Sequence, residues 1–168
     1  MKAKKILIAV TVIVGGGIAY YLISPLFITI RLDEPKIPVA VEPVVTEIEQ
    51  QKEQPAETTP EPPRITETAK IPIVGAPGHP ASGVVFVVDV NGKKHLRYED
   101  LKTINGPDIY VYLSKDLEAK EFVNLGRVRA TEGNVNYDIP PDVDPKEYPY
   151  AMTWCKMFGV LFNSAKLF

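Results

Sequence analysis

The chain has 168 residues and a formal net charge of −2, so it lacks the basic surplus typical of nucleic-acid-binding proteins. Its single cysteine excludes an internal disulfide framework and a thiolate-only zinc site. Its sixteen prolines exceed the usual share of about 5%, which indicates a proline-rich segment outside any packed domain.

An uncharged apolar run covers residues 6–30, ILIAVTVIVGGGIAYYLISPLFITI. About 20 such residues cross a bilayer as a helix, so we predict a transmembrane anchor here. Lys2, Lys4 and Lys5 precede the run, and the positive-inside rule then places residues 1–5 in the cytoplasm and the remaining chain outside. This predicts a single-pass protein of the cell membrane. The alternative is a cleaved signal peptide, whose apolar core is usually about 7–15 residues long.

Residues 31–72 are rich in proline and glutamate and contain no aromatic residue. Such a composition buries too little apolar surface to offset the entropy of ordering the chain. We predict a disordered, acidic stalk that holds a domain away from the bilayer.

Residues 73–168 consist of short apolar runs separated by turn residues. The runs SGVVFVVDV and KKHLRYEDL are joined by Asn91 and Gly92, and Asn-Gly between two such runs is the strongest short hairpin signal. Further strands are expected in IYVYL, in EFVNLGRVRAT with a bend at Gly126, and in VNYDIP. One short helix is expected at 114–120.

The last part of the chain, YPYAMTWCKMFGVLF, provides two more strand-like runs, one on each side of the neighbouring Trp154 and Cys155. Seven or eight short strands with turn residues between them predict an all-β fold, either a single small β-sandwich or a barrel-like domain.

Three segments together resemble the DM thirteen domain family, whose members are often labelled electron-transfer domains. They are LRYEDLKTINGPDIYVYLS, VNLGRVRATEGNVNYDIP and MTWCKMFGVLFNSAKL, and in order and spacing the resemblance covers residues 83–167. It implies an extracytoplasmic β-domain with Cys155 as the redox residue. In the family such domains occur alone or beside haem-binding and cytochrome modules, which implies a redox protein partner. The C-x-x-C-H motif of attached haem is missing from this sequence.

The residues themselves leave two roles open for Cys155. In a strand it shares a face with Thr153 and Met157, whereas Trp154 and Lys156 lie on the other face. If Lys156 meets solvent, Cys155 points into the core and is a buried structural thiol, the usual fate of a free cysteine. Otherwise it is a reactive thiol with Trp154 as its adjacent aromatic residue.

A copper site is a weaker alternative, because His79, His95, Cys155 and Met157 supply the ligand types of blue-copper proteins. Their spacing does not match, since no histidine follows Cys155 in the same loop. A catalytic triad, a phosphate loop and a zinc-protease motif are also missing, so a classical enzyme is not indicated and no cofactor is identified.

The sequence therefore predicts a membrane-anchored extracytoplasmic domain with a redox or electron-transfer role centred on Cys155. The alternative is a non-enzymatic binding or structural module of the cell envelope, with Cys155 buried in its core.

Overall fold

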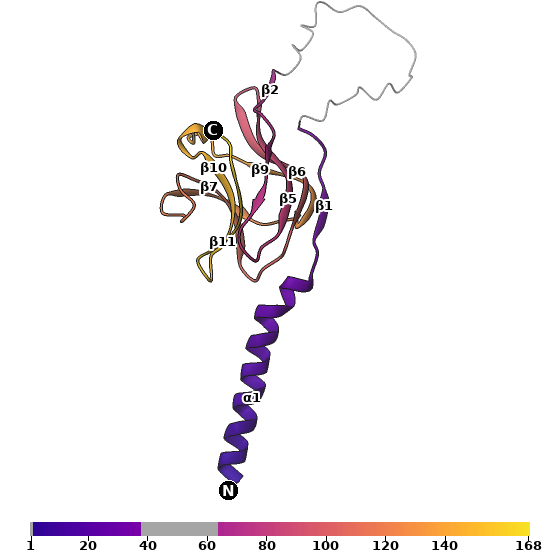
Figure 1. Ribbon diagram of the computed structural model, residues 1–168, viewed down its shortest axis with the longest axis vertical. Coiled ribbons are helices and arrows are strands. Elements are labelled where there is room, and N and C mark those ends of the chain that lie inside the picture. The colour runs from indigo at the N-terminus through magenta and orange to yellow at the C-terminus, as the bar shows by residue number, and fades with distance from the viewer. Residues whose placement is uncertain (1, 38–63) are drawn as a thin grey trace, which may run out of the picture.

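The computed structural model describes residues 2–37 and 64–168, which form an N-terminal helix and a β-rich domain (Figure 1). Helix α1 spans Lys2–Ile23 and continues as a single 3-10 turn, η1, Ser24–Phe27. Pro25 lies in η1, where its missing N–H prevents the α-helical pattern from continuing. Ala3–Phe27 is the one segment of the described residues long and apolar enough to cross a membrane, and none of it is buried against the domain. A membrane span and a signal sequence both fit this description.

The domain contains two sheets. The six-stranded sheet has the order β1 (Arg31–Asp33), β9 (Glu132–Asp138), β6 (Lys93–Thr103), β5 (Ala81–Val90) and β2 (Ile65–Glu67), with β3 (Ile71–Pro72) also paired with β5. The five-stranded sheet has the order β4 (Val74–Gly75), β11 (Val160–Lys166), β10 (Tyr150–Cys155), β7 (Ile109–Ser114) and β8 (Phe122–Arg127). A 3-10 turn, η2 (Pro145–Glu147), precedes β10.

The two sheets share one main hydrophobic core. Val85, Leu96 and Val135 enter it from the six-stranded sheet, and Val111 and Ala151 enter it from the five-stranded sheet. All five side chains are at most 2% exposed. The prediction of a mostly β protein after an apolar N-terminal helix is therefore confirmed, and the shared core is the arrangement expected of a sandwich.

The hairpin between β5 and β6 has the turn predicted from its sequence. Asn91 and Gly92 have φ values of 53° and 89°, the two positive values that an Asn-Gly hairpin turn requires. The Asp89 carboxylate accepts a hydrogen bond from the Gly92 N–H at 2.7 Å, which holds the turn closed.

The short helix expected at 114–120 is not formed, and this segment is a loop after β7. Asp116 Oδ1 accepts hydrogen bonds from the backbone N–H groups of Glu118 and Lys120, at 2.8 and 3.2 Å. An aspartate that satisfies nearby N–H groups with its own side chain offers the backbone an alternative to helical hydrogen bonds.

The prediction of a disordered stalk over residues 31–72 is wrong at both ends of this range. Residues 31–33 form β1, which pairs in parallel with β9, and residues 65–67 form β2, which pairs with β5. These strands could not be predicted from composition, because a short edge strand is stabilised more by backbone hydrogen bonds than by the burial of its side chains. Residues 38–63, the middle of the expected stalk, lie outside the described residues.

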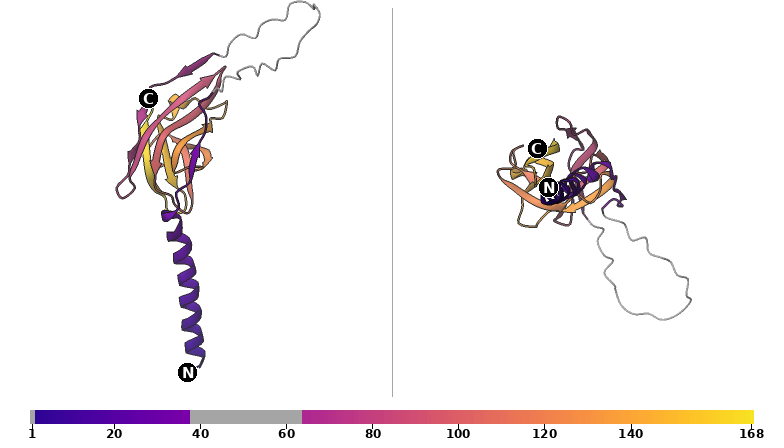
Figure 2. Two further views of the ribbon diagram at one scale, coloured as in Figure 1. Left: turned by 90° about the vertical axis from the view of Figure 1, so that its right-hand side faces the viewer. Right: turned by 90° about the horizontal axis from the view of Figure 1, so that it is seen from below.

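The domain therefore begins directly after the helix, and no stalk separates the two (Figure 2). Residues 28–30 are the whole connection between η1 and β1. Ile30 N donates to Thr131 Oγ1 at 2.9 Å, and Asn105 Nδ2 donates to the carbonyl oxygen of Ile28 at 3.1 Å. This connection is fixed to the loops at one end of the domain.

Candidate functional site

Cys155 is the last residue of β10, and its side chain is 0% exposed. It lies opposite Ile109 of β7 and Val160 of β11. Its hydrophobic cluster contains Ile109 and Phe162, with Ile104 and Val128 packed against it. These neighbours are all hydrophobic, so this thiol has the environment of a packed core residue.

Trp154 lies on the opposite side of the strand from Cys155 and is partly exposed. It is the cross-strand partner of Tyr110 on β7. Val111 between Tyr110 and Tyr112 points into the core, so both tyrosines lie on the outer face of the five-stranded sheet.

An aromatic row continues from Tyr110 along this outer face. The rings of Tyr110 and Tyr112 are stacked with centroids 6.2 Å apart, and those of Tyr112 and Phe122 are stacked at 4.1 Å. This row could not be predicted from the sequence. The position of Trp154 opposite Tyr110 and the stacking of Phe122 on Tyr112 both depend on how three strands pair.

Arg127 is the cationic residue at the Trp154 end of the aromatic row. Its guanidinium forms an ion pair with Asp108 at 2.6 Å and a hydrogen bond with Tyr110 Oη at 3.2 Å. The bond to Tyr110 is the main reason that the pKa of Arg127 is raised, and the charges of Asp108 and of Tyr21 in α1 add to it. Arg127 is thus engaged on the outer face, whereas Cys155 lies on the inner face.

Arg129 and His95 also contact carboxylates away from Cys155. Arg129 pairs with Glu34 at 2.9 Å. His95 Nδ1 lies 2.7 Å from the Asp138 carboxylate, without the alignment of a hydrogen bond. Each of these contacts lies on the six-stranded sheet or its edge.

The four residues of the copper alternative are not gathered into one site. His79 lies in the loop after β4, with its ring 4.2 Å from that of Phe162, and Met157 is exposed in the turn after β10. His95 lies on β6, in the other sheet from Cys155. Among residues 2–37 and 64–168, no group of three or more histidine, cysteine or acidic residues is placed to hold a metal ion.

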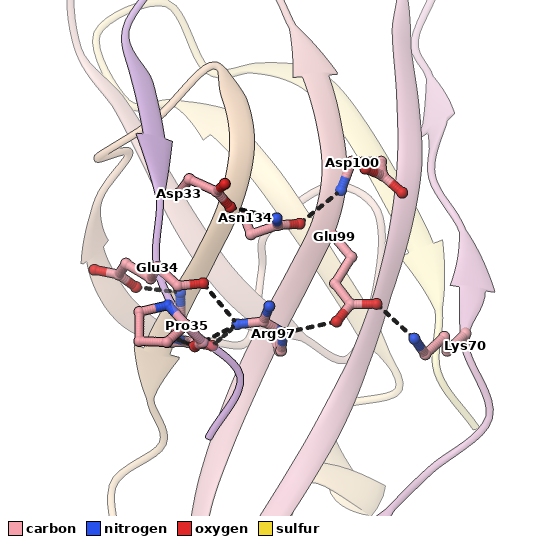
Figure 3. A network of polar contacts seen from close by, with 9 residues as sticks. Asp33, Glu34, Pro35, Lys70, Arg97, Glu99, Asp100 and Asn134 are labelled. Carbon is pink, nitrogen blue, oxygen red and sulfur yellow. Dashed lines mark hydrogen bonds and ion pairs between the residues drawn. The ribbon is translucent and has the colours of Figure 1, made fainter. Parts of the chain in front are cut away.

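A buried charge network on the six-stranded sheet was missed by the sequence analysis (Figure 3). Arg97 is 3% exposed although it alternates with the core residues Leu96 and Tyr98, so it lies on the outer face of β6. Its Nε donates to Glu99 at 2.9 Å, and Lys70 pairs with the other oxygen of that carboxylate.

The guanidinium of Arg97 also holds the chain that follows β1. Its Nη1 donates to the carbonyl oxygen of Pro35 and to Asn136 Oδ1, both at 2.9 Å. The Glu34 carboxylate accepts from Asn136 N at 2.7 Å, which closes the network over the sheet. Arg-x-Glu in a strand is typical of a solvated face, and the residues that cover Arg97 lay in the expected stalk, so burial of Arg97 could not be predicted from the sequence.

Residues 74–167 match the family described as "Electron transfer DM13". The match covers more than half of the chain and includes all strands from β4 to β11, and the chain therefore belongs to this family. The resemblance stated from the sequence is confirmed. No curated protein and no solved structure matches the chain.

Proposed function

We propose that this chain is a single-pass membrane protein whose DM13 domain lies outside the cytoplasm and takes part in electron transfer. The observation that carries the proposal is the family match over residues 74–167. The anchor is supported by α1, which is apolar and unburied, and by the basic residues Lys4 and Lys5 at its start. Because positive residues favour the cytoplasmic side of a span, these lysines support a location of the domain outside the cytoplasm.

Within this proposal electrons enter or leave through the outer face at Trp154 and Tyr110. Cys155 has no exposed surface, so the thiol of a partner protein has no access to its sulfur. Trp154 is joined to Cys155 by the backbone, is partly exposed and lies opposite Tyr110. The partner in this proposal is a redox protein of the same membrane or envelope.

A second candidate function is a non-enzymatic binding or structural module of the cell envelope. The enclosure of Cys155 by Ile104, Ile109, Val128 and Phe162 favours it, because these neighbours have the chemistry of a core. In this case Cys155 contributes packing and carries no electron.

The two functions are distinguished by electron flow across the membrane of cells that carry the full-length protein. The measurement is the rate at which intact cells reduce ferricyanide, a one-electron acceptor that does not cross membranes. Under the electron-transfer function, Cys155→Ala and Trp154→Phe both lower this rate while the protein level is unchanged. Tyr150→Phe, on the same strand, serves as the control and keeps the rate.

If cells lacking the protein reduce ferricyanide as fast as the wild type, the electron-transfer function is wrong. If only Trp154→Phe lowers the rate, Cys155 is a core residue and the aromatic row alone carries electrons. The side of the membrane is tested separately, since protease added to intact cells should digest the domain only if it lies outside.

A further inference from the structure

One end of the domain faces the outer end of α1. The connection at residues 28–30 is bonded to Asn105 in the loop between β6 and β7 and to Thr131 before β9. Arg127 pairs at 2.6 Å with Asp108, which is in the same loop as Asn105, so this arginine also lies at this end of the domain. If α1 spans a bilayer, this end of the domain lies at its surface.

The turn between β10 and β11, residues 156–159, belongs to the same end (Figures 1 and 2). Lys156 N donates to the carbonyl oxygen of Asp108 at 2.9 Å, and Asp108 is in the same loop as Asn105. Because β10 pairs with β7 as far as Cys155 and Ile109, the turn projects beyond the last paired residues.

This turn exposes large apolar side chains. Met157 is 47% exposed and Phe158 is 55% exposed, and Val160 directly after the turn is 37% exposed. About half of the surface of Met157 and of Phe158 is therefore in contact with water in the isolated protein.

The charges beside the turn are basic. Lys156 lies within it, with Nζ 5.8 Å from the centroid of the Tyr110 ring, and Arg127 lies on β8, on the far side of β7 from β10. Asp108 is the acidic residue between them, and the ion pair with Arg127 compensates its charge. Apolar tips flanked by lysine and arginine fit the interface of a membrane with anionic headgroups.

We propose that the β10–β11 turn inserts Met157 and Phe158 into the surface of the bilayer that α1 spans. The domain then contacts the membrane at two points, the connection at residues 28–30 and this turn. The inference rests on the membrane anchor of the proposed function. The bilayer is the occupant because the turn faces the helix end, where a protein partner would have to displace lipid.

The experiment uses the full-length chain in vesicles of phosphatidylcholine, with or without phosphatidylglycerol. Trp154 is the sole tryptophan and lies in the strand that leads into the turn, so its fluorescence reports on this end of the domain. Nitroxide lipids labelled near the headgroup should quench it more than lipids labelled deep in the acyl chain. Flotation of the vesicles shows independently whether α1 anchors the protein.

The test variant is M157S/F158S, and the matched control is Leu117→Ser. Leu117 is 43% exposed and lies in the loop at the other end of β7. We expect all three proteins to float with the vesicles, and quenching of Trp154 to be lost in the double variant alone. Lys156→Gln should reduce the increase in quenching that phosphatidylglycerol produces.

Failure to float means that the anchor is wrong, whatever the fluorescence shows. If the wild type floats but headgroup labels do not quench Trp154, or if the double variant is quenched as strongly, insertion of the turn is wrong. If Trp154 is unquenched and the double variant instead lowers ferricyanide reduction, the turn binds a protein partner and the inference is also overturned.

Discussion

The carbonyl oxygen of Leu32 occupies the position at which a Cβ atom of residue 133 would stand, so β1 lies against β9 only because residue 133 is glycine. Gly133 also has φ of +108°, a conformation that L side chains rarely adopt. Gly133→Ala should therefore displace β1 and destabilise the domain. The control is Gly78→Ala, because Gly78 has φ of +78° but open space around it.

We expect Gly78→Ala to cost about 1–2 kcal/mol of unfolding free energy from backbone strain alone. Gly133→Ala should cost more, and hydrogen exchange at Glu34 should become faster in that variant only, because the hydrogen bond from Glu34 N to Asn134 O belongs to the same pairing. Equal costs and unchanged exchange would show that β1 is not packed on β9.

The charged Arg97 side chain can be buried only because Glu99, Pro35 and Asn136 accept its hydrogen bonds. Arg97→Met should destabilise the protein by about 3–5 kcal/mol, since it removes the shorter of two hydrogen bonds to the Pro35 carbonyl, leaves Asn136 Oδ1 without its donor and weakens the neutralisation of Glu99. Arg31→Gln removes the exposed pair with Glu132 and should cost less than about 1 kcal/mol. Urea denaturation followed by circular dichroism measures both values.

Stability should fall in acid because of Glu99. Burial alone would raise the pKa of Glu99, but hydrogen bonds from Lys70 and Arg97 outweigh burial and lower it below its ordinary value of 4.5. A carboxylate whose pKa is lower in the folded state stabilises that state above the unfolded pKa. This stabilisation is lost as the pH falls below 4.5 toward the lowered value.

Glu99→Gln should remove this part of the pH dependence, so that its unfolding free energy changes less than that of the wild type over the acidic range. Glu132→Gln, in the exposed pair with Arg31, is the control and should keep the wild-type slope. Parallel slopes for the wild type and Glu99→Gln would contradict the lowered pKa.

The sequence was sufficient to predict the strands that have a distinct apolar run of their own. The β5–β6 hairpin followed from two apolar runs and the Asn-Gly turn, and β7, β9 and β10 lie where their apolar runs predicted. The run predicted after Cys155, residues 157–162, overlaps β11 only from Val160, because residues 157–159 form the turn. The edge strand β1 was missed because the features that hold it lie in other strands, namely Gly133 of β9 and Arg97 of β6, which binds the Pro35 carbonyl after β1. The edge strand β2 was missed because its pairing with β5 is a backbone contact between distant segments.

Cys155 and Trp154 were named as candidate site residues from the sequence, but their surroundings could not be predicted from it. Alternation along β10 placed Cys155 and Trp154 on opposite faces but left the burial of Cys155 open, and in the structure Cys155 is 0% exposed. The stacking of Tyr112 on Phe122 could not be predicted, because it depends on the register between β7 and β8 and on the irregularity between Val111 and Tyr112.

Cys155 should react slowly with a thiol reagent in the native protein and quickly after unfolding, because its side chain is fully buried. Met157→Cys in a Cys155→Ala background provides the fast native control, since position 157 is 47% exposed. Cys155→Ala should cost about 1–2 kcal/mol through lost packing. Cys155→Ser should cost at least as much, because a buried hydroxyl needs a partner. Fast native labelling with unchanged stability would show that the thiol is open to solvent.

The segment 38–63 leaves the domain after β1 at one edge of the six-stranded sheet and returns to it before β2 at the opposite edge. Its length therefore has no influence on the distance between the domain and the helix, which residues 28–30 determine alone. It also follows that α1 and β1 belong to one N-terminal segment. This segment is held to the rest of the domain by the pairing of β1 with β9 as well as by the covalent chain. Residues 1–37 and 64–168, expressed as two separate polypeptides, should therefore reassociate into a complete domain, with the first supplying both the edge strand and the helix.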